Sequence, residues 1–483
     1  MLRRSTVTAI SLLACVVTLA GATMLGVHAA IPAAGTIVVD AGTPIRKLPA
    51  TFFGINYVGF WDNHQGSAAS ARALAHTPIK LVRFPGGDPA DWYDWQDPYY
   101  KGWSRTSPSD LWQYVRTLGG TALFQTNYQG HLPNPPGHTY AVNSPQNAAA
   151  WVRYNRAHGI DAIMEVGNEE DITMRSRHDR AFQRYIDLFN AQARAMHAVD
   201  RRVKVIGPAG TNEWYWWGLD ALGMFLHQTG NRSGSGQVDG VSLHFYQGSS
   251  WDDSRGVAQH WLRPDGPWAF IQQTIRANAT RNLPVYVSEW NVGAAGVHND
   301  FNATLAHALV TADMIGAFAQ SGVAGEVYFD IHSAHGWGLL YGDGEGRPVD
   351  TPTPTYYATA LWSAMGPYVL HLRSGDDPVT TLSAYATRRD DGSVQVLAIN
   401  KLGEPRRLQI AFTHFNPRGH TLHVYDLRGH QGRLTDLDAD YDGVLMPSPT
   451  RRLPGPRVTG RITGTSVTYT MPPYSVVVLA ITG

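Results

Sequence analysis

The sequence predicts a (β/α)8 (TIM) barrel followed by a C-terminal β-sandwich. Its 483 residues are enough for a barrel of roughly 250–330 residues and a smaller module. Between residues 51 and 366, short apolar runs alternate with longer stretches of helical periodicity, as in βα units around a parallel sheet. Residues 367–483 contain short runs of strand-forming residues separated by turn sequences, which is typical of a sandwich.

Eight apolar runs are predicted to form the barrel strands. They are Phe52–Tyr57, Ile79–Phe84, Thr121–Thr126, Ala162–Val166, Val203–Gly207, Gly240–His244, Val285–Ser288 and Gly325–Asp330. Two of the intervening stretches, Asp179–Val199 and Asn302–Ser321, have apolar residues at clear helical spacing. Eight strands favour a closed barrel over an open doubly wound sheet, and no Gly-rich phosphate-binding motif follows the first strand.

The two ends of the chain differ from the barrel segment. Residues 1–30 have a basic start, an apolar stretch from about Ala9 to Val27 and small residues at Ala29 and Ala30. This pattern indicates a cleaved secretory signal or, given its length, an uncleaved signal-anchor, and predicts a secreted or periplasmic protein. Residues 31–50 are expected to form a linker and a strand that joins the sandwich. Cys15 is the only cysteine, so the mature chain would have neither disulfides nor a catalytic thiol.

Composition narrows the choice of partner. Lys plus Arg and Asp plus Glu both number 39, so the formal net charge is zero and nothing indicates nucleic-acid binding. The chain has 15 Trp and 22 Tyr, and aromatic faces stack on the apolar faces of sugar rings. We therefore expect an oligosaccharide or polysaccharide as the partner, with no membrane contact beyond an N-terminal anchor.

Two glutamates stand where barrel chemistry is expected, just past the carboxyl ends of strands four and seven. Glu169 follows Asn168, and Glu289 precedes Trp290 and Asn291. Cleavage of a glycosidic bond needs one protonated and one ionised carboxyl group. A lone strand-end Glu is more often a salt bridge or a loop cap, but two on these strands favour catalysis.

These residues resemble glycoside hydrolase clan A, in which the Glu after Asn is the acid/base and the strand-seven Glu is the nucleophile. More narrowly, Arg83–Asp88, Trp92–Trp95 and Pro472–Ser475 resemble the family 51 α-L-arabinofuranosidases. Families 44, 39 and 79 share the architecture. The resemblance spans nearly the whole mature chain. It departs at Asp88, where family 51 usually has Asn, and at Glu170, where relatives often carry Met or Pro.

The resemblance implies a retaining mechanism. Glu289 would attack the anomeric carbon, Glu169 would protonate the leaving oxygen, and the two carboxyl groups would lie about 5–5.5 Å apart. We expect the substrate to contact further strand-end side chains, although each could instead have a purely structural role. They are Arg83, Asn168, His244, Tyr246, Trp290, Trp337, Asn56, Trp95, Asn127 and Tyr128. No metal site and no cofactor are predicted, since the stretch His332–His335 lacks a third ligand.

Three functions fit this pattern. The first is an exported α-L-arabinofuranosidase-like enzyme acting on plant or microbial polysaccharide, and the second is an endo-β-glycanase of the same clan, such as a cellulase, xyloglucanase or xylanase. The third is a non-catalytic carbohydrate-binding protein on the same barrel. A serine hydrolase is disfavoured, because no G-x-S-x-G motif follows any strand.

Overall fold

The computed structural model describes residues 32–62, 67–98, 105–130, 140–171, 179–211, 221–230, 237–293, 301–333 and 336–483. The expected export signal, residues 1–30, lies outside these ranges. Within them, no helix combines the length and the apolar character that crossing a membrane requires.

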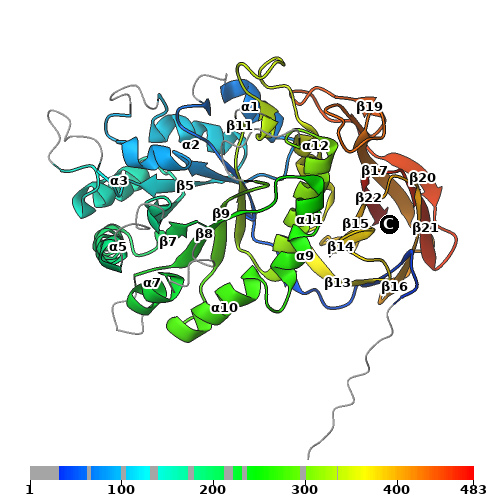
Figure 1. Ribbon diagram of the computed structural model, residues 1–483, viewed down its shortest axis with the longest axis horizontal. Helices are drawn as coiled ribbons and strands as arrows, with labels where there is room; N and C mark the ends of the chain where they lie inside the picture. The colour runs from blue at the N-terminus through cyan, green and yellow to red at the C-terminus, as the bar shows by residue number, and fades with distance from the viewer. Residues whose placement is uncertain are drawn as a thin grey trace, which may run out of the picture. The chain divides into compact units, whose positions relative to one another are not determined.

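Eight parallel strands close into a barrel, which confirms the predicted fold class (Figure 1). They are β3 (Phe53–Asn56), β4 (Leu81–Phe84), β5 (Thr121–Thr126), β6 (Ala162–Val166), β7 (Lys204–Gly210), β8 (Gly240–Tyr246), β9 (Val285–Asn291) and β10 (Gly325–Tyr328). Neighbours in sequence pair in space, and β10 closes the ring by pairing with β3. All eight predicted strands are present.

Helices surround the barrel, and several begin at the residues that the chain supplies as caps. The helices are α1 (Ser67–Leu74), α2 (Pro108–Thr117), α3 (Pro145–Ala157), α5 (Asp179–Val199), α7 (Ala221–Thr229), α8 (Trp251–Ser254), α9 (Val257–Leu262), α10 (Pro267–Asn278), α11 (Leu305–Ser321) and α12 (Pro354–Leu361). Ser107, Ser144 and Thr353 each accept a backbone N–H at a helix start that is followed by proline. Thr304 caps α11 in the same way, so this helix starts three residues later than predicted.

The barrel interior is layered. Side chains alternate between the inside and the outside of each strand, and the inner positions nearest the strand starts form an apolar layer. That layer consists of Leu81, Leu123, Ile163, Ile206, Tyr286 and Val327. Two residues further along three of these strands stand Arg83, Gln125 and Glu165, all with no exposed surface. The barrel interior is therefore apolar near the starts of its strands and polar near their carboxyl ends.

The second region is built on an antiparallel framework. Its 12-stranded arrangement includes β1 (Thr36–Asp40), which pairs with one strand antiparallel and with another parallel. The other strands are β2 (Arg46–Lys47), β13 (Tyr368–Ser374), β14 (Leu382–Arg388), β15 (Val394–Asn400), β16 (Arg406–Thr413), β17 (Thr421–Gly429), β18 (Ala439–Tyr441), β19 (Val444–Leu445), β20 (Arg457–Arg461), β21 (Ser466–Met471) and β22 (Ser475–Thr482). Apolar side chains from their facing surfaces form a separate core, as expected for the predicted sandwich.

Helices α11 and α12 lie between the barrel strands and the sandwich (Figure 1). Asp313 of α11 accepts hydrogen bonds from Lys401 at 2.8 Å and from Tyr385 at 2.6 Å, both from the sandwich. The Asp313 and Lys401 side chains are only 2% exposed, so this ion pair is buried in the junction. Such a pair fixes orientation between packed elements, because separating it would strand two charges away from water.

Candidate active site

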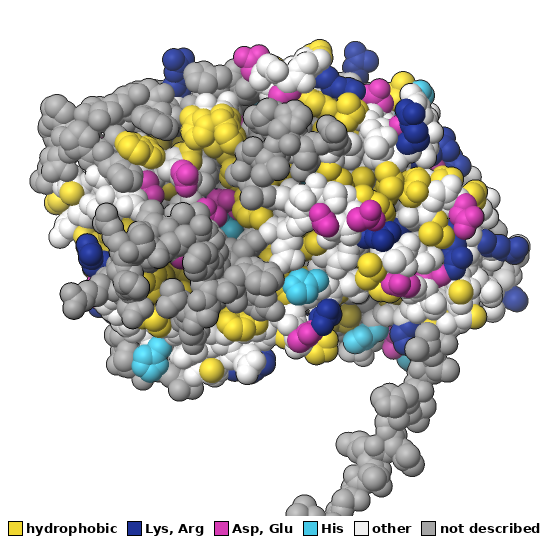
Figure 2. Space-filling model, viewed as in Figure 1, with side chains coloured by type: hydrophobic (Ala, Val, Ile, Leu, Met, Phe, Trp, Pro, Cys, Tyr) yellow, Lys and Arg dark blue, Asp and Glu magenta, His cyan; other side chains and the backbone are white. Residues whose placement is uncertain are grey.

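Polar side chains converge at the carboxyl ends of β4, β6, β8 and β9. In the space-filling view, some Asp and Glu side chains lie near the middle of the barrel, and others lie over the sandwich, together with Lys and Arg (Figure 2). The converging residues are Arg83, Asn168, Glu169, His244, Tyr246 and Glu289. The site thus gathers residues that lie up to about two hundred positions apart in the chain, as Arg83 and Glu289 do.

A bulge in β9 turns Glu289 into the barrel. The partner of Leu243 is Val287, but the partner of His244 is Glu289, so Ser288 is an extra residue. Before the extra residue, Val285 and Val287 pack in the core outside the barrel. After it, Trp290 and Val292 take those outward-facing positions. Without the extra residue, strict alternation would point Trp290 inward and Glu289 outward.

Glu289 is 5% exposed and has a hydrogen-bond donor on each oxygen. Arg83 Nη1 donates to Oε1 at 2.6 Å, and the Tyr246 hydroxyl donates to Oε2 at 2.7 Å. Burial raises the pKa of Glu289, while the Arg83 cation and the Tyr246 hydrogen bond act in the opposite direction. Charge-assisted bonds of this length favour the ionised carboxylate.

Arg83 has no exposed surface and uses all five of its N–H groups. Nε donates to Glu165 at 2.6 Å, and Nη1 donates to Asn56 at 3.0 Å as well as to Glu289. Nη2 donates to Asn168 at 2.9 Å and faces His244 Nε2 at 3.4 Å. This guanidinium therefore fixes the positions of five side chains around it.

His244 links the two glutamates. Its Nδ1 lies 2.7 Å from Glu169 Oε1 and 3.5 Å from Glu289 Oε2. Arg83 can only donate, so Nε2 of the ring must accept, and a neutral His244 carries its hydrogen on Nδ1 and donates it to Glu169. Burial lowers the pKa of His244 and supports this neutral form. One ligand atom from each of Glu169, His244 and Glu289 lies within 4.8 Å of the others.

The chain resembles known proteins in sequence and in fold. Residues 148–330 match the model of glycosyl hydrolases family 39. A β-xylosidase of Geobacillus stearothermophilus is 26% identical over 265 residues, which cover 50% of this chain and 47% of the xylosidase. This chain thus spans about half the length of that curated relative.

Solved structures share the whole architecture. An α-L-arabinofuranosidase from Thermotoga maritima, in complex with arabinose, superposes with a TM-score of 0.69 at 17% identity and covers 93% of this chain and 100% of its own. A family 44 xyloglucanase from Paenibacillus polymyxa gives 0.65 at 12% identity, covering 93% of this chain and 99% of its own. These identities establish a common fold, and the family 39 match adds a sequence relation. The chain is therefore similar to glycoside hydrolases of clan A, in sequence over residues 148–330 and in fold over nearly its whole length.

Trp290 and Trp95, two of the predicted aromatic residues, lie in different surroundings, and the prediction for Trp290 is wrong. Trp290 is 1% exposed on the outer side of β9, where it packs against Phe318 and donates to Glu326, so it is not a sugar platform. The bulge at Ser288 is the reason. Trp95 is partly exposed, stacks on Trp151 of α3 at 5.9 Å and donates to Asn147, and its role in an outer subsite stays a prediction.

Two asparagines also have structural roles. Asn56 has no exposed surface; its amide donates to Ser288 O and its oxygen accepts from Arg83, so it supports the guanidinium that holds the site together. Asn127 closes its own turn by accepting Gly130 N–H at 2.8 Å. Neither is an outer-subsite residue, because the polar atoms of each bind the protein itself.

Three other predicted residues pack against side chains that support the two catalytic candidates. Trp337 stacks on Tyr246 at 5.6 Å and supports that ring. Tyr128 packs against Tyr185 at 5.3 Å beside the loop after β6. Asn168 accepts from Arg83 and donates to Asp88 at 3.2 Å, so its amide faces the exposed Asp88 at the rim.

Sequence reasoning missed two buried members of the network. Glu165 pairs with Arg83, and Gln125 donates to Asn168 at 3.3 Å and accepts Gly86 N–H at 2.8 Å. The sequence did contain a signal for Glu165, which is an acid inside the apolar strand Ala162–Val166. A charged group in a strand that is buried on both faces needs a partner, so an ion pair could have been expected there.

Glu169, His244 and Glu289 are also the set that a metal ion could use among the residues described. Both oxygens of Glu289 already accept hydrogen bonds, and the Arg83 cation lies 2.6 Å from one of them. A second cation at this point would be repelled by that guanidinium. The arrangement suits two-carboxylate chemistry better than a metal centre.

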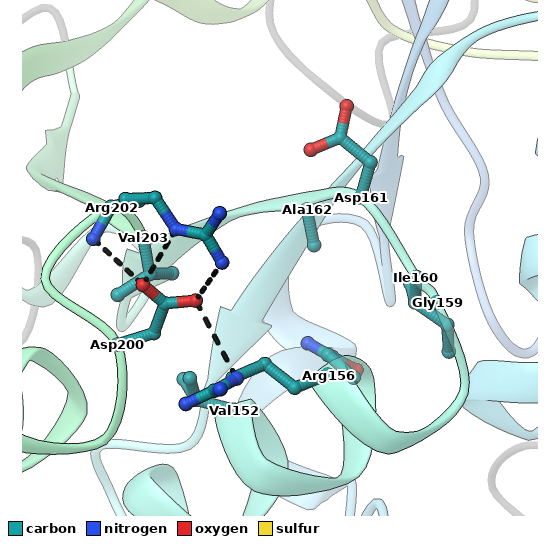
Figure 3. A pocket seen from close by; sticks show the side chains of 10 residues that line it. Val152, Arg156, Gly159, Ile160, Asp161, Ala162, Asp200, Arg202 and Val203 are labelled. Carbon is teal, nitrogen blue, oxygen red and sulfur yellow. Dashed lines mark hydrogen bonds and ion pairs between the residues drawn. The ribbon is translucent and has the colours of Figure 1, made fainter.

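A separate cavity of about 580 Å³ lies at the other end of the barrel, around the start of β6. Asp200 sits between Arg156 and Arg202, at 3.7 and 3.0 Å, and Asp161 points away from them (Figure 3). Asp200 and the two arginines satisfy one another, and this end of a βα barrel serves stability. The candidate active site is therefore the cluster at the strand ends.

Proposed function

We propose that the chain is a retaining glycoside hydrolase that works by double displacement, with Glu289 as nucleophile and Glu169 as acid/base. The observation that carries this proposal is the short separation of the two groups, whose nearest oxygens lie within 4.8 Å. Retaining enzymes hold their carboxyl groups about 5–5.5 Å apart, whereas inverting enzymes leave about 6.5–9.5 Å for a water.

In the first step, a Glu289 oxygen forms a bond to the anomeric carbon while the bond to the leaving oxygen breaks. Glu169 transfers its proton to that oxygen. Arg83 and Tyr246 keep Glu289 ionised and orient it before attack. Because His244 donates to Oε1 of Glu169, the proton to be transferred is assigned to Oε2.

In the second step, Glu169 removes a proton from water, the oxygen of that water attacks the anomeric carbon, and the bond to Glu289 breaks. Glu169 thereby regains its proton. The loss of negative charge on glycosylated Glu289 removes a repulsion that favours protonated Glu169, so the same residue can act first as acid and then as base.

The substrate class proposed is a terminal α-L-arabinofuranosyl or β-xylosyl residue of a plant or microbial polysaccharide. The arabinofuranosidase folds and the β-xylosidase relative support it. Export also belongs to the proposal, supported by the basic and apolar pattern of residues 1–30. A polymer too large to enter cells must be cut outside them.

The test is hydrolysis by the purified chain of nitrophenyl α-L-arabinofuranoside and nitrophenyl β-xyloside, beside arabinoxylan and xyloglucan. Proton NMR of the first product formed should show the anomer of the substrate. Glu289→Ala and Glu169→Ala should both lose the activity found. An inverted first product, or two variants as active as the wild type, would contradict the mechanism; cleavage of internal xyloglucan bonds alone would replace the substrate class with an endo-glycanase.

A further inference from the structure

The backbone that presents Glu169 is held in an uncommon conformation. Glu169 has φ of 50°, in the left-handed region that side chains other than glycine seldom adopt. Its N–H donates to Ala209 O at 3.0 Å. On one flank, Asp171 accepts from the Thr211 hydroxyl at 2.6 Å and so ties the segment to the loop after β7.

The opposite flank is tied by Glu170, whose role the chemistry above leaves open. Glu170 is 1% exposed and accepts a hydrogen bond from the Gln129 side-chain amide. The backbone N–H of Gln129 donates in turn to Asp91 Oδ1 at 3.0 Å. Asp91, Gln129 and Glu170 follow β4, β5 and β6, so they join three neighbouring loops beneath the acid/base candidate.

The Glu170 carboxyl group is neutral in this setting. Burial raises its pKa to about 10, and the neighbouring carboxyl groups of Asp91 and Asp171 add to the effect. Burial likewise raises the pKa of Asp91 to about 7, with Asp88 contributing. The other titratable groups that face the cluster are Tyr128, Tyr185 and Arg184. A neutral acid can accept from Gln129 without placing a charge beside Glu169.

We propose that Glu170 is a positioning residue for Glu169, holding the left-handed backbone so that the Glu169 carboxyl group meets His244 and faces Glu289. This inference rests on the proposed function. A side chain at 170 that cannot accept from Gln129 would release one of the two flanking ties. Glu169 would then relax and present its proton poorly, while Glu289, Arg83 and Tyr246 would remain in place.

Leaving-group dependence tests this role, because a good leaving group needs no proton. We would compare kcat/KM for 2,4-dinitrophenyl and unsubstituted phenyl glycosides of the sugar that the wild type accepts. Glu170→Ala should reduce the phenyl value about 100-fold and the dinitrophenyl value less than about 3-fold. Glu170→Gln, which keeps an acceptor and stays neutral, should retain both values within about 3-fold.

Gln129→Met is a second variant that removes the donor and keeps Glu170, and it should reproduce the Glu170→Ala pattern. Asp442→Ala is the matched control: it removes a half-buried carboxyl group from the sandwich and should change neither value. Equal losses on both substrates, or a Gln variant as poor as Ala, would overturn the inference while leaving the wild type an active glycosidase. A wild type inactive on every glycoside would instead overturn the proposed function, and this inference with it.

Discussion

The nucleophile side and the acid side of the site bury carboxyl groups in opposite ways. Glu289 and Glu170 are 5% and 1% exposed, and burial raises the pKa of each. Glu289 has a guanidinium at 2.6 Å and a phenol at 2.7 Å. Glu170 has an uncharged amide donor and further carboxyl groups nearby. Burial is common to both, so the partner decides which carboxyl group is ionised.

This contrast explains how two glutamates in one pocket can have different roles. A buried carboxylate beside a cation is stabilised as an anion, whereas one among other acids is stabilised as the neutral form. Glu169 lies between the two environments, bonded to a neutral His244 and adjacent in sequence to Glu170. Substitutions on either side should remove or sharpen this difference between the nucleophile side and the acid side. They follow in order of decreasing expected effect.

Replacing Glu289 by Gln should abolish the nucleophile while keeping the size of the side chain. We expect kcat/KM to fall by about 10⁴-fold or more, because no covalent intermediate can form. Steady-state rates on the best nitrophenyl substrate would measure this, with circular dichroism confirming that the barrel is folded. A variant that keeps more than about one per cent of activity would remove Glu289 from the mechanism.

Replacing Glu169 by Ala should affect the acid side alone. We expect kcat to fall by about 10²–10⁴-fold, and azide should restore turnover by attacking the glycosyl-enzyme without needing a base. The product would be a glycosyl azide that retains the substrate's anomeric configuration, identifiable by NMR. Restoration of Glu289→Ala by azide, which can enter the space left by the shortened side chain, with a product of inverted configuration is the matched comparison. An exchange of these two outcomes would exchange the roles.

Replacing Tyr246 by Phe should weaken the nucleophile side without abolishing it. Loss of a hydrogen bond to a charged group corresponds to about 1.5–3 kcal/mol, or roughly 10–150-fold in kcat/KM. Because this bond favours ionised Glu289, its loss should raise the pKa of Glu289 further and move the acidic limb of the pH profile to higher pH. An unmoved acidic limb would mean that Tyr246 does not act on Glu289.

Replacing Glu170 by Gln should change stability, with the sign set by pH. The folded state holds the proton on Glu170 up to about pH 10, whereas the unfolded chain releases it near 4.5, so burial of this acid becomes less favourable as pH rises through that window. Glu170→Gln should therefore melt at the wild-type temperature at pH 4 and a few degrees higher at pH 8. Asp442→Asn should show a similar gain that levels off near pH 7. A Glu170→Gln gain already present at pH 4 would contradict a neutral Glu170.

Much of this molecule follows from periodicity. The eight strand runs, the helix between Asp179 and Val199 and the acids at two strand ends are visible because parallel strands are apolar and chemistry gathers where they end. Arg83, His244 and Tyr246 were also placed near the glutamates by this argument, and the structure brings all three into contact with them.

The sequence could not reveal features that depend on the exact register of a strand or on which side chains meet in the folded barrel. The one-residue bulge at Ser288 decides whether Glu289 or Trp290 faces the barrel, and nothing in the local composition marks it. Asn56 supports Arg83 from the neighbouring strand β3, and Glu165 reaches it from β6, two strands away, so the sequence alone does not show that their side chains meet. Asn127 was misplaced because a strand-end position does not distinguish a pocket side chain from one that closes its own loop.

The five donors of Arg83 have a consequence for how activity is lost on heating. Their acceptors come from β3, from β6 and the loop after it, from β8 and from β9. One side chain therefore binds residues from more than half of the way around the barrel. The contacts of Arg83 with both sides of the site form only when strands from β3 to β9 are all in place. Inactivation and melting of the barrel should therefore be a single cooperative event, and catalytic rate becomes a direct reporter of barrel closure.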